Sequence, residues 1–145
     1  MVLVTDIEQL RKVTELVKKT DDILKVAEDL FREMVEFHAQ GLAANQLGYD
    51  LKMFVMERNN GVPTCIVNPV IVKTKGWYEA NEICSSLPGV SVRVKRPKEI
   101  RVRGVNQYFM PVNYKFKGSE ARRACHEIDH LIGKLITDYQ TEAKK

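Results

Sequence analysis

The sequence lacks any apolar run close to the ~20 residues that a membrane-spanning helix needs. Aromatic residues are also scarce, with five Tyr, five Phe and one Trp, and they form no stripe with basic residues. The net charge is only +4, and the longest basic clusters are pairs such as Lys18-Lys19. We therefore expect no direct contact with membranes or nucleic acids.

Cysteine is rare as well, and its three copies, Cys65, Cys84 and Cys125, cannot all be paired within the chain. An odd count argues against a disulfide framework and favours a reducing compartment. The first ten residues carry Asp6 and Glu8 and lack the charged-then-apolar pattern of a secretory signal. We expect a cytoplasmic protein.

The composition is that of a folded globular protein, with 44% hydrophobic and 29% charged residues. Apolar residues recur every three or four positions over Asp21–Phe37, which predicts a long helix, with Gly41 as its C-cap or following turn. A shorter helix is predicted before it, at Ile7–Val17. A final helix is predicted from an N-cap at Ser119 to an end at Gly133.

The middle of the chain is predicted to be β-rich. Short apolar or alternating segments, separated by Gly, Pro and Asn, indicate strands at Lys52–Met56, Cys65–Val67, Val70–Lys73, Val90–Val94, Ile100–Val105 and Val112–Phe116. A further short strand is predicted at Leu135–Tyr139. The expected fold is a single α+β domain over residues 1–145, in which this β-rich middle packs around the C-terminal helix and a long helix precedes it.

The C-terminal helix carries the pattern H-E-x-x-H at residues 126–130. Residues four apart lie on one face of a helix, so His126 and His130 can bind the same metal ion. A metal lowers the pKa of bound water from ~16 toward ~7, and Glu127 is placed to take the remaining proton and pass it to a leaving amine. The pattern predicts a metal-dependent amide hydrolase; the alternative is a helix whose histidines are only structural.

A third protein ligand is expected, because a tetrahedral catalytic metal usually has three. The fifteen residues after His130 contain no His or Cys. Cys84 is the attractive upstream candidate, in a segment, Asn81–Gly89, that is predicted to be a polar loop. A free cysteine is, however, more often a small buried hydrophobe, and Cys65 and Cys125 are interpreted in that way.

The segment Gly41–Gly48 combines small residues with Gln46. Small residues allow the backbone to approach a ligand closely. A glutamine amide can donate a hydrogen bond to a developing oxyanion. The alternative is that the segment only packs tightly.

Taken in order, these three segments resemble peptide deformylase. That family carries G-x-G-L-A-A-x-Q, then E-G-C-L-S, then H-E-x-D-H, and this chain has AQGLAANQ at 39–46, EICSS at 82–86 and HEIDH at 126–130. Asn68-Pro69 and Arg96-Pro97 also resemble the family. The resemblance extends over nearly the whole chain.

The resemblance implies an enzyme that removes the N-formyl group from the N-terminal methionine of newly made polypeptides and releases formate. Its partners would be N-formyl-methionyl nascent chains, and also the ribosome near the exit tunnel. It implies one divalent metal ion, Fe(II) in the first place and otherwise Zn(II), Ni(II) or Co(II), held by Cys84, His126 and His130.

The resemblance also implies roles for other residues. Glu127 would be the general base and then the acid, while the Gln46 amide and the Ser85 backbone N–H would bind the formyl oxygen. Substrate contacts are expected at Gly41, Leu42 and Ile83. Glu82 and Arg96 would form a supporting ion pair, and Asp129 would orient a histidine or the backbone.

The chain departs from the family pattern at Ala39, Ile83, Ser85 and Cys125. None of these changes removes a ligand, the base or the amide donor, but Ile83 adds bulk beside the expected substrate groove. One alternative is therefore a catalytically weakened relative that binds peptides or the ribosome. Another, on H-E-x-x-H alone, is a metallopeptidase that cuts ordinary peptide bonds.

Overall fold

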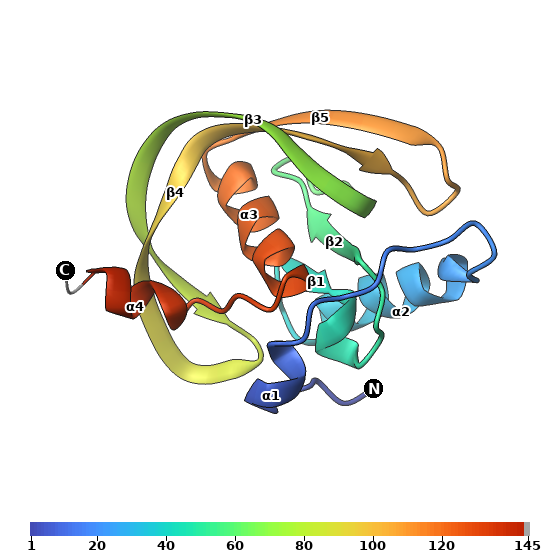
Figure 1. Cartoon of the computed structure of the whole chain (residues 1–145), viewed down its shortest axis with the longest axis horizontal. Coiled ribbons are helices and arrows are strands. Elements are labelled where there is room, and N and C mark those ends of the chain that lie inside the picture. Colours follow the sequence, from blue (N-terminus) through green and yellow to red (C-terminus); the bar gives the residue numbers. More distant parts are fainter. Residues whose placement is uncertain (144–145) are drawn as a thin grey trace.

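The computed structural model describes residues 1–143, and for residues 141–143 only the backbone. One antiparallel sheet has the strand order β1-β2-β3-β4-β5 (Figure 1). Its strands are β1 (Gly41–Ala43), β2 (Met53–Glu57), β3 (Pro63–Cys84), β4 (Leu87–Val105) and β5 (Pro111–Lys117). The helices are α1 (Ile7–Leu10), α2 (Ile23–Glu36), α3 (Ser119–Leu131) and α4 (Asp138–Ala143), with a 3₁₀ turn η1 (Ala44–Leu47). The expected α+β class is confirmed.

The long helix α2 forms where the apolar repeat predicts it. Ile23, Leu30 and Met34 are buried in a core shared with β1, β2 and η1, and burying each stabilises the fold by about 1.5–3 kcal/mol. The helix ends at Phe37, and His38 takes the left-handed conformation with φ of 53°. The prediction of Gly41 as the helix C-cap is therefore wrong, because that residue begins β1.

The strands β3 and β4 form one long ribbon that curves around α3 (Figure 1). The separate short strands predicted here lie within it, and the ribbon continues through polar residues because each strand satisfies the backbone of the other. Gly76, with φ of 68°, lies within β3. The predicted polar loop at 81–89 is wrong: Cys84 is the last residue of β3, and only Ser85 and Ser86 separate the strands.

The helix α3 lies on the concave side of the sheet. Its buried Ala121, Ala124 and Leu131 belong to a core that also contains Ile100 and Phe116 from β4 and β5. Gly118 occupies the N-cap position, and Ser119, the predicted cap, is the first helical residue. The small side chains of α3 bring its backbone close to the sheet, so that its motif residues approach the end of β3.

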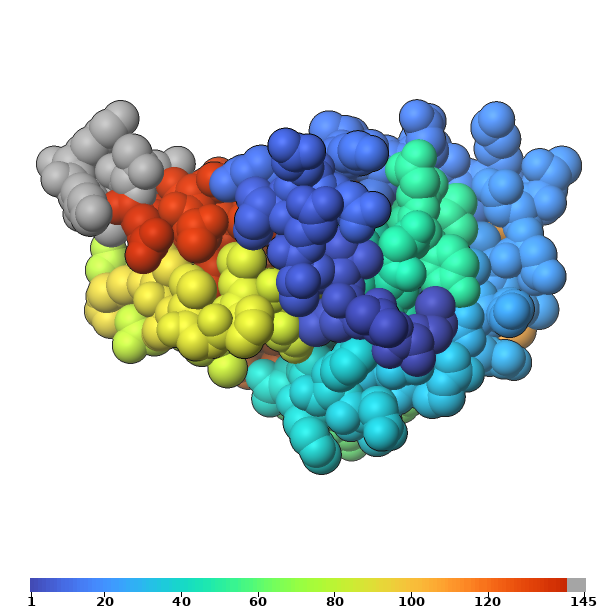
Figure 2. Space-filling view, turned by 90° about the horizontal axis from the view of Figure 1, so that it is seen from below, coloured from blue at the N-terminus to red at the C-terminus, as the bar shows by residue number. Residues whose placement is uncertain are grey.

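Two predictions near the ends of the chain are wrong. The first helix stops at Leu10, because the following backbone bonds elsewhere: the Thr14 amide donates to the Leu131 carbonyl at 2.9 Å. The predicted strand at Leu135–Tyr139 is instead a loop that leads into α4, where Leu135 is buried against Leu10 and Leu87. Figure 2 shows the N-terminal residues against both the β3–β4 turn and the segment around η1. Among the described helices, none has the length and apolar character to cross a membrane.

Candidate active site and metal centre

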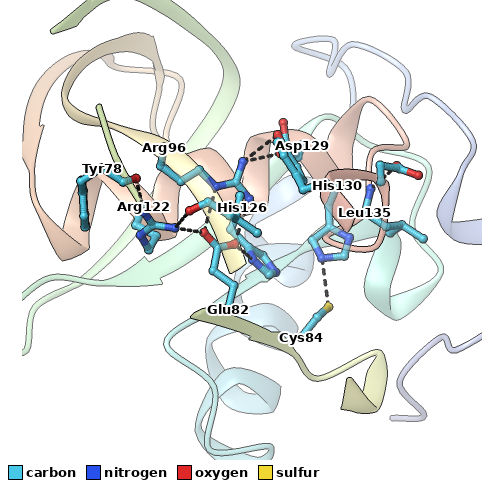
Figure 3. Close-up of polar contacts among 12 residues, drawn as sticks. Tyr78, Glu82, Cys84, Arg96, Arg122, His126, Asp129, His130 and Leu135 are labelled. Atoms are coloured by element: carbon cyan, nitrogen blue, oxygen red, sulfur yellow. Dashed lines mark hydrogen bonds and ion pairs between the residues drawn. The ribbon is translucent and has the colours of Figure 1, made fainter. Parts of the chain in front are cut away.

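The three predicted metal ligands lie together. His126 and His130, one turn apart on α3, have ring centroids 5.1 Å apart, and Cys84 approaches them from the end of β3 (Figure 3). One ligand atom from each residue lies within 4.8 Å of the others. The Cys84 sulfur is 3.3 Å from His130 Nε2, and both side chains are buried. Two segments 42 or more positions apart in the sequence thus form one potential metal site.

The residues fit a divalent transition metal. A thiolate and two imidazoles suit iron, zinc, nickel or cobalt, and three protein ligands leave a coordination position open. The Glu82 carboxylate is 3.0 Å from His126 Nδ1, which fixes the ring so that Nε2 is free to bind a metal.

Glu82 is held by three cationic or hydrogen-bonding side chains on the buried side of His126. Arg96 donates two hydrogen bonds to its carboxylate, each 2.9 Å long, and Arg122 donates a third (Figure 3). Burial alone would raise the pKa of Glu82, but the bonds from His126 and Arg96 outweigh it and lower the pKa to about 2. The expected ion pair of Glu82 and Arg96 is confirmed, whereas the sequence did not indicate Arg122.

Asp129 was expected to orient a histidine or the backbone, but its carboxylate contacts other side chains. Its carboxylate accepts hydrogen bonds from Arg96 and from the Tyr139 hydroxyl, the latter at 2.6 Å. The Arg96 guanidinium also lies 4.8 Å from the centre of the Tyr139 ring. Asp129 therefore supports the guanidinium that holds Glu82, and connects α3 with α4.

Glu127 differs from every other acid of the site. Its side chain is buried, and its Oε1 atom is without a hydrogen-bond partner among the described residues. Burial raises its pKa to about 7, so the carboxyl can accept and release a proton near neutral pH. A Cβ atom on Gly41 would lie 2.6 Å from Glu127 Oε2, which shows why a glycine is needed at this point of β1.

The amide of Gln46 is oriented toward the same centre. The Ala43 backbone N–H donates to its oxygen at 3.0 Å, which directs the nitrogen away from β1. That nitrogen donates to the Ser86 hydroxyl at 3.1 Å and lies 3.9 Å from the Cys84 sulfur. The sequence predicted Gln46, but no role was inferred for its partner Ser86, although Ser86 is the last residue of the EICSS segment.

A cleft of about 950 Å³ opens onto these groups. Gly41, Ile83 and Ser85 lie along it, as expected of residues that contact a substrate, and the Ile83 side chain is 76% exposed. The Leu42 side chain is fully buried beneath α2 and does not line the cleft, because side chains alternate between the faces of β1, so only the backbone of Leu42 is placed for the expected substrate contact. Cys65 and Cys125 are buried in the core, as predicted, where burial raises the pKa of each thiol to about 12.

Comparisons with known proteins agree with this geometry. The sequence pattern of the family described as polypeptide deformylase matches residues 1–145. The peptide deformylase of Rhodopirellula baltica is 39% identical over 134 residues, which are 89% of this chain and 67% of that protein. The peptide deformylase of Alkaliphilus metalliredigens is 40% identical over 130 residues, 89% of this chain and 88% of that protein.

Solved structures show the same likeness. The peptide deformylase of Ehrlichia chaffeensis in complex with actinonin superposes with a TM-score of 0.93 at 32% identity, over 99% of this chain and 90% of that one. The deformylase of the Vibrio parahaemolyticus bacteriophage VP16T, also with actinonin, gives 0.89 at 30% identity, over 94% of this chain and all of that one. The resemblance carried by the three motifs is confirmed, and this chain belongs to the polypeptide deformylase family of metal-dependent hydrolases.

Proposed function

We propose that this protein removes the formyl group from the N-terminal methionine of newly made polypeptides and releases formate. The observation that carries the proposal is the buried carboxyl of Glu127, whose Oε1 has no hydrogen-bond partner in the described part of the chain, beside the Cys84–His126–His130 cluster in a cleft that is open to a peptide. Residues 1–145 would act as one catalytic domain in the cytoplasm.

Cys84, His126 and His130 would hold the metal, Fe(II) in the first place, with Zn(II), Ni(II) or Co(II) able to take its place. A divalent metal in such a site polarises a carbonyl group and lowers the pKa of water. Glu82 would keep His126 in the orientation that directs Nε2 to the metal, since it accepts from Nδ1.

Glu127 would move the proton. It accepts a proton from the water that attacks the formyl carbon, and it then donates that proton to the methionine amine as the carbon–nitrogen bond breaks. A pKa near 7 allows both directions of transfer. The position next to Gly41 leaves space for the carboxyl on the cleft side of β1.

Gln46 and Ser85 would stabilise the negative charge that develops on the formyl oxygen. Gln46 offers its side-chain nitrogen, already directed toward Cys84, and Ser85 offers its backbone N–H at the β3–β4 turn. Donors that are fixed before the reaction cost no reorganisation when the charge appears.

The peptide would lie along β1 and the end of β3. Gly41 and the backbone of Leu42 lie on the edge strand β1, and Ile83 offers an exposed apolar side chain opposite. N-formyl-methionyl nascent chains are the proposed substrates, and the ribosome near the exit tunnel is the proposed place where the enzyme meets them.

The test is formate release from N-formyl-Met-Ala-Ser by protein purified without oxygen and loaded with Fe(II). Glu127→Gln should bind the metal equally but lose a factor of ~10² or more in rate. N-acetyl-Met-Ala-Ser and unblocked Met-Ala-Ser should remain intact; their cleavage would indicate a peptidase instead. Metal-loaded protein without turnover would contradict the proposal and favour a peptide-binding relative.

A further inference from the structure

The outer face of the sheet is the side away from α3 (Figure 1). Strand register places on this face basic residues that are dispersed in the sequence. Lys73 on β3 lies opposite Arg101 on β4, which lies opposite Lys115 on β5. Ile100 and Val102, on either side of Arg101, are buried toward α3, so the row formed by the three cations is on the opposite face.

The next row of the same face is also basic. It contains Lys75, Glu99 and Lys117 in neighbouring strands. The Glu99 carboxylate is shared, since it lies 3.7 Å from both Lys115 and Lys117. The basic face, as we define it, consists of the five cations in these two rows: Lys73, Lys75, Arg101, Lys115 and Lys117.

Like charges placed directly opposite each other destabilise a sheet. Among residues 1–140, whose side chains the structure describes, neither Lys73 nor Arg101 forms an ion pair with a carboxylate; Arg101 instead donates to the Asn113 side chain at 3.2 Å. Glu99 is the one carboxylate in the two rows of the described sheet. The repulsion among the three cations lowers the stability of the sheet, and an anionic partner that neutralises their charge would explain why the row exists.

The spacing of the cations suits an extended anion. Neighbours within a row are ~4.8 Å apart and the rows are ~6.8 Å apart, so the charges form a strip. A hollow of about 60 Å³ is lined by four of the cations, by the Glu99 carboxylate that two lysines share, and by Thr74 and Ile100. That volume admits a phosphate group but not a folded partner, and neither row contains an apolar side chain that would enter a bilayer.

An aromatic side chain lies beside the strip. Trp77 is the one tryptophan of the sequence, and its side chain is 56% exposed. It follows Lys75 by two positions on β3, opposite Pro97, and therefore lies on the same face. A positively charged surface with an adjoining exposed aromatic ring is how proteins bind single strands without sequence preference.

We propose that the basic face binds the phosphates of a single-stranded polynucleotide and that Trp77 stacks on one of its bases. The sequence argued against such binding because its basic residues are scattered, but strand pairing brings five of them together. The inference that the polynucleotide is RNA, as at a ribosome, rests on the proposed function. The inference that the basic face binds a polynucleotide does not rest on it.

The test measures binding of a labelled oligouridylate of about 12 nucleotides to the metal-loaded protein by fluorescence anisotropy, in salt from about 50 mM upward. Binding should quench the fluorescence of Trp77 and weaken with salt. Lys73→Thr/Arg101→Thr/Lys115→Thr should bind at least about tenfold more weakly and reduce the slope of log affinity against log salt by about 2. Trp77→Ala should weaken binding about tenfold.

The matched control is Lys12→Thr/Lys18→Thr/Lys19→Thr, which removes the same charge from exposed positions outside the sheet. This control should keep both binding and salt slope. Lys73→Arg/Arg101→Lys/Lys115→Arg should also keep them, which separates charge from any fault in folding. All four variants should still release formate, so a failure of the proposed function would be seen apart from a failure of binding.

Equal loss in the two neutralised triple variants would overturn the proposal, because net charge alone would then explain binding. It would also be overturned if oligouridylate left Trp77 fluorescence unchanged while vesicles with about 30% phosphatidylserine shifted it to the blue, since the face would then contact a membrane.

Discussion

Glu82 and Glu127 are both neighbours of His126, the first through a hydrogen bond to Nδ1 and the second in the sequence, and they are buried to nearly the same degree, with 6% and 5% of their surfaces exposed. Their acidities nevertheless differ widely. The pKa of Glu82 is lowered to about 2, and that of Glu127 is raised to about 7. Burial raises the pKa of both groups, so the difference comes from their partners.

On the Glu82 side, each charge has a partner: Arg96, Arg122 and His126 surround the carboxylate, and Asp129 supports Arg96. On the Glu127 side, Gly41 removes a side chain and one carboxyl oxygen is left without a partner among the described residues. The first side can fix the position of a metal ligand, and the second keeps a proton exchangeable. Holding the metal ligand in position and transferring the proton are thus the tasks of two different carboxyls.

The largest expected effect follows from removing Arg96, which holds the Glu82 carboxylate. Arg96→Met removes the guanidinium but leaves Glu82 buried, which should lower the free energy of unfolding by about 3–5 kcal/mol. Urea denaturation of the metal-loaded protein measures it. Arg93→Met is the matched control: it breaks the exposed Arg93–Glu79 pair, of 2.9 Å, and should cost less than about 1 kcal/mol. Equal losses would mean that the buried cluster contributes no more than a surface ion pair.

The contrast could not have been predicted from the sequence. The H-E-x-x-H spacing predicts which face of α3 carries the histidines, and the motif order led to Cys84, because those patterns are local or shared by a family. The partners of Glu82 depend on how β3 and β4 curve around α3, and nothing near Arg122 in the sequence indicates that it contacts residues 40 or more positions away.

The fold class was predicted correctly, and the elements that were predicted wrongly have a related reason. The repeat in α2 is local, so its helix was predicted nearly to the residue. The ribbon of β3 and β4 is stabilised by pairing between distant residues, and its exposed middle has no apolar alternation that would indicate a strand. Leu135 and Ile136 were assigned to a strand because they are apolar, but they fill a core under a loop that precedes α4.

The second prediction concerns the protonation of Glu127 in the metal-free protein. Glu127 binds its proton more tightly when folded, with a pKa of about 7 against 4.5 unfolded. Its protonation therefore stabilises the fold fully below pH 4.5, and this stability is lost as pH rises through 7, by about 3 kcal/mol in total. We expect the free energy of unfolding of the wild type, minus that of Glu127→Gln, to fall over this range. A difference that stays constant from pH 4 to 8 would contradict the raised pKa.

The third prediction tests whether Gly41 matters through Glu127. Gly41→Ala places a Cβ atom 2.6 Å from Glu127 Oε2, and the carboxyl must move away from the cleft. Formate release should fall by about 10- to 100-fold, since small displacements of a catalytic group cost that much. In a Glu127→Gln background the same substitution should change the rate little, because the displaced group no longer transfers a proton. Equal losses in both backgrounds would mean that Gly41→Ala acts on the substrate instead.

The smallest expected effect is that of changing Tyr139, which contacts Asp129 and Arg96 and not Glu82 itself. Tyr139→Phe removes the hydroxyl that donates to Asp129 at 2.6 Å and accepts from Arg96 at 3.0 Å, while Arg96 still donates to the Asp129 carboxylate. The free energy of unfolding should fall by about 1–2 kcal/mol, since each hydrogen bond usually contributes about 1 kcal/mol net. Tyr108→Phe, at a 64% exposed ring, is the control and should change little. A loss as large as that from Arg96→Met would show that Arg96 depends on Tyr139, and that α4 is as necessary to the position of Glu82 as β4.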